Sequence, residues 1–140
     1  MAHRIIYQTE TKAVIKVWGL SGTTTDTIAL ATDLLSSTME VSGTPAVNIN
    51  FVTWCVTAGA SDLITITRGA VPVGYWYQNG EVDFGGNGGW SEDTNNTSNI
   101  VVTIVGSGVC FITVRKVSGY LSKIQPEVFG SYDNTTSTSA

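Results

Sequence analysis

Two pairs of carboxylates stand close enough in the sequence to act together. Glu81 and Asp83 flank a single residue, which on a strand turns both side chains to one face, and Glu92 and Asp93 are adjacent. Two carboxyl groups carry out glycoside hydrolysis, in which one of them must hold a proton at neutral pH. The sequence around both pairs shows no device that would keep a proton there. We therefore expect solvated acidic residues and no hydrolase.

Other catalytic and metal-binding groups are equally scarce. His3 is the only histidine and lies at the start of the chain, which we expect to be flexible, so mechanisms that need a histidine base or a histidine-bound zinc ion are disfavoured. Residues 90–99 collect oxygen ligands but lack the spaced pattern of a calcium-binding EF-hand loop. No phosphate-binding loop, GxSxG turn or HExxH helix is present. The sequence predicts no enzyme, no metal and no cofactor.

The most distinctive stretch is VGYWYQNGEVDFGG, residues 73–86. Asn79-Gly80 is the strongest two-residue hairpin signal, because a type I′ turn needs positive φ at both central positions. Such a turn would pair residues 75–78 with residues 81–84, and alternation would then divide the side chains between two faces. We expect one face to be core and the other to be outward; the first holds Tyr75, Tyr77, Val82 and Phe84, and the second holds Trp76, Gln78, Glu81 and Asp83.

Two tryptophans are candidate anchors for a partner. Trp76, placed among polar residues, is either an isolated exposed side chain or a group that a protein or a sugar covers. Trp90 follows the glycine-rich residues 85–89 and is either a second anchor or a lid folded over the end of the domain. Asn87 and the two carboxylates Glu81 and Asp83 are candidate acceptors for sugar hydroxyl groups.

The fold is predicted to be all-β. Short β-branched runs alternate with turn signals, and no long segment has the 3.6-residue period of a helix, as in antiparallel β-sandwiches of jelly-roll or immunoglobulin-like topology. Residues 4–8 and 13–18 predict an opening hairpin, and Gly106-Ser107-Gly108 predicts a second one between residues 100–105 and 109–115. Pro72 predicts an edge strand or a bulge.

Further strand candidates are residues 27–30, 39–41, 63–68 and 117–124, with one helical turn possible at residues 33–35 and a central strand at 47–57. We expect one sandwich domain over residues 1–125 and a polar C-terminal tail over residues 126–140, loose unless a partner orders it.

Composition narrows the range of partners. The net charge is −4 with no cluster of Lys or Arg, which disfavours nucleic acid and anionic membranes. No apolar run approaches the length of a membrane span or a signal peptide, so an exported or membrane protein is not expected. Cys55 and Cys110 both lie in apolar strand candidates, so two buried free thiols are favoured over a disulfide.

Four segments of the chain, YQTETKAVIKVWGLSG, ITITRGAVPVGYW, FITVRKVSGYL and FGSYDNTTSTSA, resemble those of small virion proteins of tailed phages, particularly phages of marine bacteria. The resemblance extends over most of the chain. It implies a capsid decoration protein or a head-tail or tail accessory protein, present in many symmetric copies, assembled in the host cytoplasm and located in the virion.

The leading hypothesis is a non-enzymatic structural protein that docks on capsid or head-tail subunits and can form a homo-oligomer. Low charge and abundant Ser and Thr fit that role. The alternative is a carbohydrate-binding module or a receptor-binding fibre domain that uses Trp76 or Trp90 with Glu81 and Asp83. The candidate interaction residues are Trp76, Gln78, Glu81, Asp83, Asn87, Trp90 and, in the tail, Tyr132.

Overall fold

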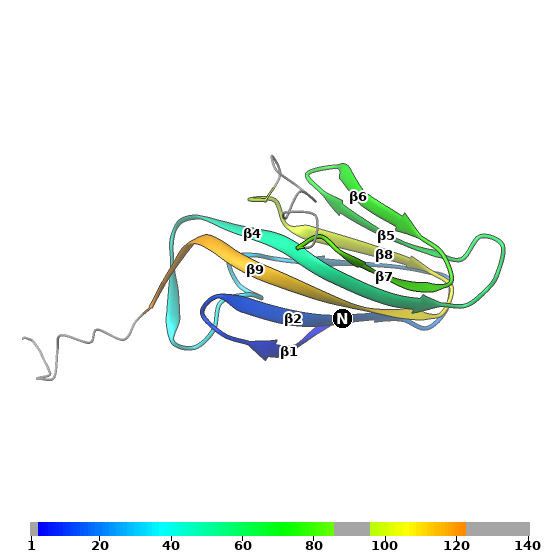
Figure 1. The fold of residues 1–140 in the computed structure, drawn as a ribbon, viewed down its shortest axis with the longest axis horizontal. Helices are drawn as coiled ribbons and strands as arrows, with labels where there is room; N and C mark the ends of the chain where they lie inside the picture. Colours follow the sequence, from blue (N-terminus) through cyan, green and yellow to red (C-terminus); the bar gives the residue numbers. More distant parts are fainter. Residues whose placement is uncertain (1–2, 86–95, 123–140) are drawn as a thin grey trace, which may run out of the picture.

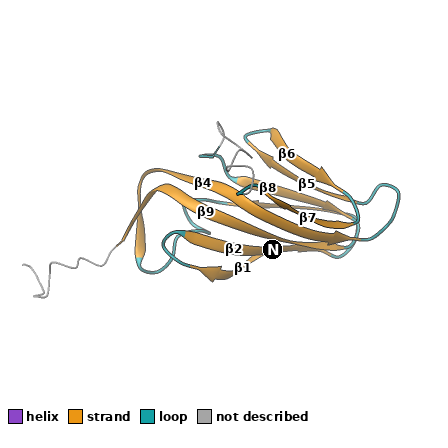
Figure 2. Cartoon of the chain, in the orientation of Figure 1, coloured by secondary structure: helices purple, strands orange, loops and turns teal. Residues whose placement is uncertain are grey.

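A computed structural model describes residues 3–85 and 96–122. These residues form nine strands and no helix (Figure 2). The strands are β1 (His3–Gln8), β2 (Lys12–Gly19), β3 (Thr23–Ile28), β4 (Met39–Val56), β5 (Leu63–Arg68), β6 (Val71–Trp76), β7 (Asn79–Asp83), β8 (Ile100–Val105) and β9 (Gly108–Ser122).

The strands form two antiparallel sheets, so the all-β prediction is confirmed. Sheet A has the order β1-β2-β9-β4-β7 and sheet B has the order β3-β8-β5-β6. Figure 1 shows β4 and β9 as a long pair that continues past the ends of the other strands. Both sheets contribute to one hydrophobic core, because the alternate apolar residues of β2, β4, β5, β8 and β9 are buried. Ile15 and Ile112 enter it from sheet A, and Ile64 and Ile104 enter it from sheet B.

Several local expectations are confirmed. The opening hairpin is present, since β1 pairs with β2. Residues 47–56 lie within β4, which is an interior strand between β9 and β7. Pro72 lies in β6, the edge strand of sheet B, beside an irregularity in the β5–β6 register. Proline has no N–H to donate, so an edge is where a sheet tolerates it.

The hairpin predicted at Gly106-Ser107-Gly108 is wrong, although both of its strands exist. β8 lies in sheet B between β3 and β5, whereas β9 lies in sheet A between β2 and β4. Length explains the outcome, because the 15 residues of β9 run beside the 18 residues of β4, a match that the six residues of β8 cannot offer. The glycines instead carry the chain from one sheet to the other. Gly106 has a φ of 96° and donates its N–H to the Gly22 carbonyl at 2.8 Å.

Two other boundaries differ from the prediction. Residues 39–41 and 47–57 were expected as separate strands, but they form the single strand β4 with register irregularities between Val41 and Val47. The strand expected at residues 27–30 lies earlier, at Thr23–Ile28, and the segment after it makes a turn in which the Asp33 N–H donates to the Ala29 carbonyl. The strand expected at 117–124 is the end of β9. The boundary at residue 125 and the tail at 126–140 lie outside the described residues.

Candidate functional site

The hairpin predicted at Asn79-Gly80 is also wrong. β6 belongs to sheet B and pairs with β5, whereas β7 belongs to sheet A and pairs with β4. The chain crosses between the sheets at residues 77–78, and Gln78 has the positive φ, 59°, that such a sharp crossing requires. Asn79 and Gly80 are strand residues opposite Cys55 and Trp54.

A pair of stacked indoles explains the glycine at position 80. The rings of Trp54, from sheet A, and Trp76, from sheet B, have centroids 5.0 Å apart and planes inclined by 22°. Trp54 also donates its Nε1–H to the Tyr77 carbonyl at 3.1 Å. A Cβ at position 80 would lie 2.8 Å from the Trp54 ring, and a Cβ at Gly74 would overlap the Trp76 ring. The Asn-Gly signal therefore reflects space for an indole and not a turn.

The stack reverses the predicted faces of the aromatic residues. Trp76 packs against the core, whereas Tyr75 and Tyr77 are 60% and 56% exposed. The expectation that the two tyrosines are core and that Trp76 is outward is therefore wrong. The cause is the crossing, because Trp76 takes its orientation from β5 and not from β7. Val82 and Phe84 do pack against the core, as predicted.

The predicted site residues consequently do not form one cluster. Trp76 points between the sheets, while Glu81 and Asp83 are exposed and pair with Thr53 and Phe51 of β4. Gln78 is exposed at the crossing. Asn87, Trp90 and Tyr132 lie outside the described residues, as does most of the candidate calcium loop.

The carboxylates belong instead to a surface that was not predicted from the sequence, the side of sheet A that faces away from the core. We call it the outer face of sheet A. On this face, the pairing of β2, β9 and β4 aligns Trp18, Val109 and Cys55 in one row. Lys16, Phe111 and Thr53 form the next row. Further members are Lys12, Val14, Asn50, Phe51, Asn79, Glu81, Asp83, Thr113 and Arg115.

Three aromatic residues cross this face diagonally. Trp18 in β2, Phe111 in β9 and Phe51 in β4 occupy diagonal register positions on neighbouring strands. Such neighbours lie about 7–8 Å apart, within reach of large side chains. A single outward aromatic residue in a strand gives no signal in the sequence. That Trp18, Phe111 and Phe51 are neighbours follows only from the pairing of the three strands.

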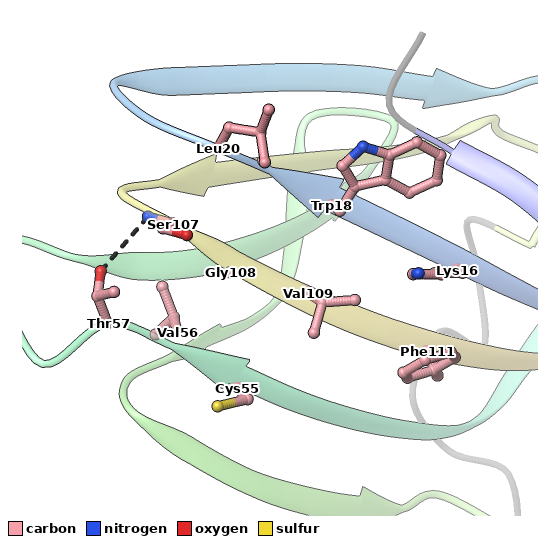
Figure 3. A pocket seen from close by; sticks show the side chains of 11 residues that line it. Lys16, Trp18, Leu20, Cys55, Val56, Thr57, Ser107, Gly108, Val109 and Phe111 are labelled. Carbon is pink, nitrogen blue, oxygen red and sulfur yellow. Dashed lines mark hydrogen bonds between the residues drawn. The ribbon is translucent and has the colours of Figure 1, made fainter.

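One end of the outer face is hollowed into a groove of about 590 Å³, which we call the apolar groove. Figure 3 shows Trp18 and Leu20 on one side, Val109 and Phe111 from β9, and Cys55 from β4. A hydrogen bond from the Ser107 N–H to Thr57 Oγ1 closes the end of the groove. The Lys16 ammonium lies 5.5 Å from the Trp18 ring centroid, the geometry of a cation–π contact.

The other end of the same face holds a smaller groove of about 300 Å³, which we call the polar groove. Its side chains combine both charges, an amide, hydroxyl groups and one aromatic ring. The principal lining residues are Lys12, Asn50, Phe51, Asp83, Thr113 and Arg115.

The two cysteines have different environments. Both are free thiols, in agreement with the prediction, but Cys55 is exposed in the apolar groove and only Cys110 is buried. Register explains the difference, because Cys110 lies opposite Trp54 and shares its inward parity, whereas Cys55 has the outward parity. Burial raises the pKa of the Cys110 thiol from 9.0 to about 12, so it stays protonated and unreactive.

His3 is not at a loose end of the chain, contrary to expectation. It is buried, with Nδ1 2.5 Å from Asp26 Oδ2 and Nε2 3.4 Å from Asp33 Oδ2. Both ring nitrogens therefore face carboxylate oxygens of the protein itself. The contact joins β1 at the edge of sheet A to β3 at the edge of sheet B.

Two buried cations also connect parts of the fold. The Arg68 guanidinium is fully buried and donates to the carbonyls of Val47, Ser98 and Asn96 at 2.8–2.9 Å. Its parity with the inward residues Ile64 and Ile66 was the sequence signal for this burial. Lys116 donates to the Gln8 side chain and the Thr9 carbonyl, and desolvation lowers its pKa from 10.5 to about 8 despite the opposing influence of Glu10.

Within residues 3–85 and 96–122, no three His, Cys, Asp or Glu side chains converge in a way that could hold a metal ion. The same residues contain no helix long and apolar enough to span a membrane. Comparison of the chain with protein-family models, with curated proteins and with solved structures found no match in any of the three.

Proposed function

We propose that this chain is a non-enzymatic structural protein of a tailed-phage virion, of the capsid decoration or head-tail accessory type. It docks on a neighbouring virion subunit through the apolar groove. The resemblance of its β-rich segments to phage virion proteins is the first support, and the geometry of sheet A supplies the docking surface.

The strand order supports a jelly-roll sandwich in preference to an immunoglobulin-like one. Strands β2 to β9 divide into two groups of four, β2-β9-β4-β7 and β3-β8-β5-β6, with β1 added at one edge. Among the connections from β2 to β9, only the one from β5 to β6 stays within a sheet. Eight strands in two such Greek-key sheets are the jelly-roll arrangement, which occurs in viral capsid proteins and in lectins. Architecture alone does not assign a function, so the proposed function rests on the surface of sheet A.

The apolar groove is the observation that carries the proposal. Its centre is formed by Trp18, Val109 and Phe111, and at its rim Leu20 is 80% exposed. A contiguous apolar hollow on a protein surface marks a place that another molecule covers, and tryptophan is enriched among the residues that dominate binding energy. We assign it to a partner subunit that inserts apolar side chains, because one basic residue, Lys16, is the only charged group in the lining.

A carboxylate placed in the groove tests the proposal. Val109→Glu buries a charge at the centre of the interface, so purified variant chain should cosediment at least 100-fold more weakly than wild type with virions that lack the chain. The matched control is Thr103→Glu, which puts the same carboxylate on the outward side of the central strand β8 in sheet B. Circular dichroism checks that both variants are folded. Equal cosedimentation of Val109→Glu and wild type would contradict docking through this groove.

A further inference from the structure

The polar groove is shaped by a backbone irregularity. In the β4–β9 register, Ile49 lies opposite Val114 and Phe51 lies opposite Thr113, so Asn50 is an extra residue in β4. Such a bulge turns two consecutive side chains to the same side, and both Asn50 and Phe51 line the groove. Bulges of this kind are frequent next to binding sites because they redirect a side chain.

The bulge also fixes the end of β7. The Asn50 carbonyl accepts hydrogen bonds from the N–H groups of Phe84 and Gly85, at 2.8 and 3.1 Å. These two bonds follow directly after Asp83, which pairs with Phe51 and also lines the groove. The Asn50 amide and the Asp83 carboxylate lie close together beside Gly85, because a Cβ at that glycine would be 3.9 Å from Asn50 Oδ1 and 3.1 Å from Asp83 Oδ1.

Three kinds of recognition chemistry meet in this groove. The Phe51 ring offers an apolar platform for C–H groups, and Asn50 and Asp83 offer acceptors for hydroxyl hydrogens. Lys12 and Arg115, paired across β2 and β9, offer two positive charges, of which the guanidinium can hold a carboxylate with two parallel hydrogen bonds. We propose that the polar groove binds a carboxylate-bearing sugar residue of the uronic acid type.

The dimensions and the charges select this ligand class. A volume of about 300 Å³ is at the small end of ligand pockets, which suits a single sugar residue. Nucleic acid is disfavoured because Asp83 lies in the groove and the chain carries a net charge of −4. This site differs from the sugar site predicted around Trp76, and the two have Asp83 in common. It lies on the outer face of sheet A, as does the apolar groove. The inference does not depend on the virion role, because it concerns binding by the isolated chain.

Titration of the ¹⁵N-labelled chain with free sugars tests the proposal. We expect D-galacturonate or D-glucuronate to shift the amide resonances of Asn50, Phe51 and Thr113 in a saturable manner. The neutral sugars D-galactose and D-glucose should bind at least about tenfold more weakly, because they lack the charge-assisted hydrogen bonds. An absence of saturable shifts, shifts confined to the apolar groove, or equal affinity for acidic and neutral sugars would overturn the proposal.

Two variants identify the groups responsible. Arg115→Gln should remove the preference for the acidic sugar, a loss of about tenfold in affinity, while leaving weak binding through Phe51 and Asp83. Arg4→Gln removes a positive charge from β1 on the same sheet, outside the lining of both grooves, so it should leave the affinity unchanged. If Arg115→Gln binds galacturonate as wild type does, or if Arg4→Gln weakens binding equally, the assignment of the carboxylate to this groove is wrong.

Discussion

The outward surfaces of the two sheets cover the same core but differ in composition. Sheet A presents aromatic residues such as Trp18 and Phe111 together with charges, and it is hollowed at both ends. Sheet B presents threonines on its other strands, with Thr25, Thr103 and Thr65 in one row, and the aromatic Tyr75 continues that row only on the edge strand β6. The hydroxyl groups of Thr25 and Thr103 lie 3.3 Å apart and share one hydrogen bond.

Threonine is a conservative choice for an exposed strand, since it is β-branched and polar. The core therefore does not require aromatic residues on the outward side of an interior strand, and those on β2, β9 and β4 of sheet A need another explanation. We attribute them to binding. It follows that substitutions on the outer face of sheet A should change binding with little cost in stability, whereas inward substitutions should do the reverse.

The largest difference in the free energy of unfolding is expected between a variant of the buried Arg68 and a variant of the exposed Arg115. Arg68→Met removes the guanidinium donors from the carbonyls of Val47, Ser98 and Asn96, and should lower the free energy of unfolding by about 3–5 kcal/mol. The Asn96 carbonyl keeps a hydrogen bond from the Val47 N–H. Arg115→Gln, on the exposed surface, should change it by less than about 0.5 kcal/mol. Urea denaturation of both variants makes the measurement. A similar loss of stability in the two variants would show that Arg68 and Arg115 do not differ in their contribution to folding.

A somewhat smaller effect separates two neighbouring aromatic residues. Trp76→Ala removes half of the indole stack between the sheets and should cost about 3 kcal/mol. Tyr75→Ala lies on the outward side of sheet B and should cost less than about 1 kcal/mol. Thermal unfolding of the two variants at equal concentration provides the comparison. A greater loss in Tyr75→Ala would restore the orientation predicted from the sequence.

The smallest effect concerns the pH dependence of stability at Lys116. Its folded pKa of about 8 lies below the unfolded value of 10.5, so between these values the unfolded state binds more protons and stability contributed by this group rises with pH. Relative to Lys116→Met, the wild type should gain about 1 kcal/mol between pH 8 and pH 9. This interval lies at or below the unfolded pKa values of Cys110 and Tyr120, whose raised folded values act in the opposite direction at higher pH. A constant difference between wild type and variant would show that Lys116 is solvated.

Alternation in the sequence predicted the strands well, because burial of one side of each strand requires a period of two residues. Ile64, Ile66, Ile100, Val102 and Ile104 all point inward as that pattern indicates. The two hairpins failed for a common reason. Asn79-Gly80 and Gly106-Ser107-Gly108 satisfy the local chemistry of turns, but which strand pairs with which depends on contacts distant in the sequence.

The candidate site could not be predicted from the sequence for the same reason, because it depends on which strands pair. Trp18, Phe111 and Phe51 belong to three strands that are far apart along the chain, and only the sheet order places them on one surface. The bulge at Asn50 is likewise a result of pairing with β9, and residues 47–51 carry no glycine or proline to announce it. Asp83 was recognised as a candidate ligand group, but its partners could not be identified from its neighbours in the sequence.

Docking through the outer face of sheet A is tested most directly by attaching a bulky label to one exposed cysteine. The cysteine is placed first on the outward side of sheet A and then on the outward side of sheet B. Cys55 lies in the apolar groove, and the buried Cys110 does not compete for a thiol reagent. Wild-type chain that carries a bulky maleimide on Cys55 should fail to bind virions that lack this protein. The double variant Cys55→Ser with Thr65→Cys, labelled on the outward side of sheet B, should bind them normally. Normal binding by the Cys55-labelled chain, or loss of binding only when the label is on sheet B, would contradict the account.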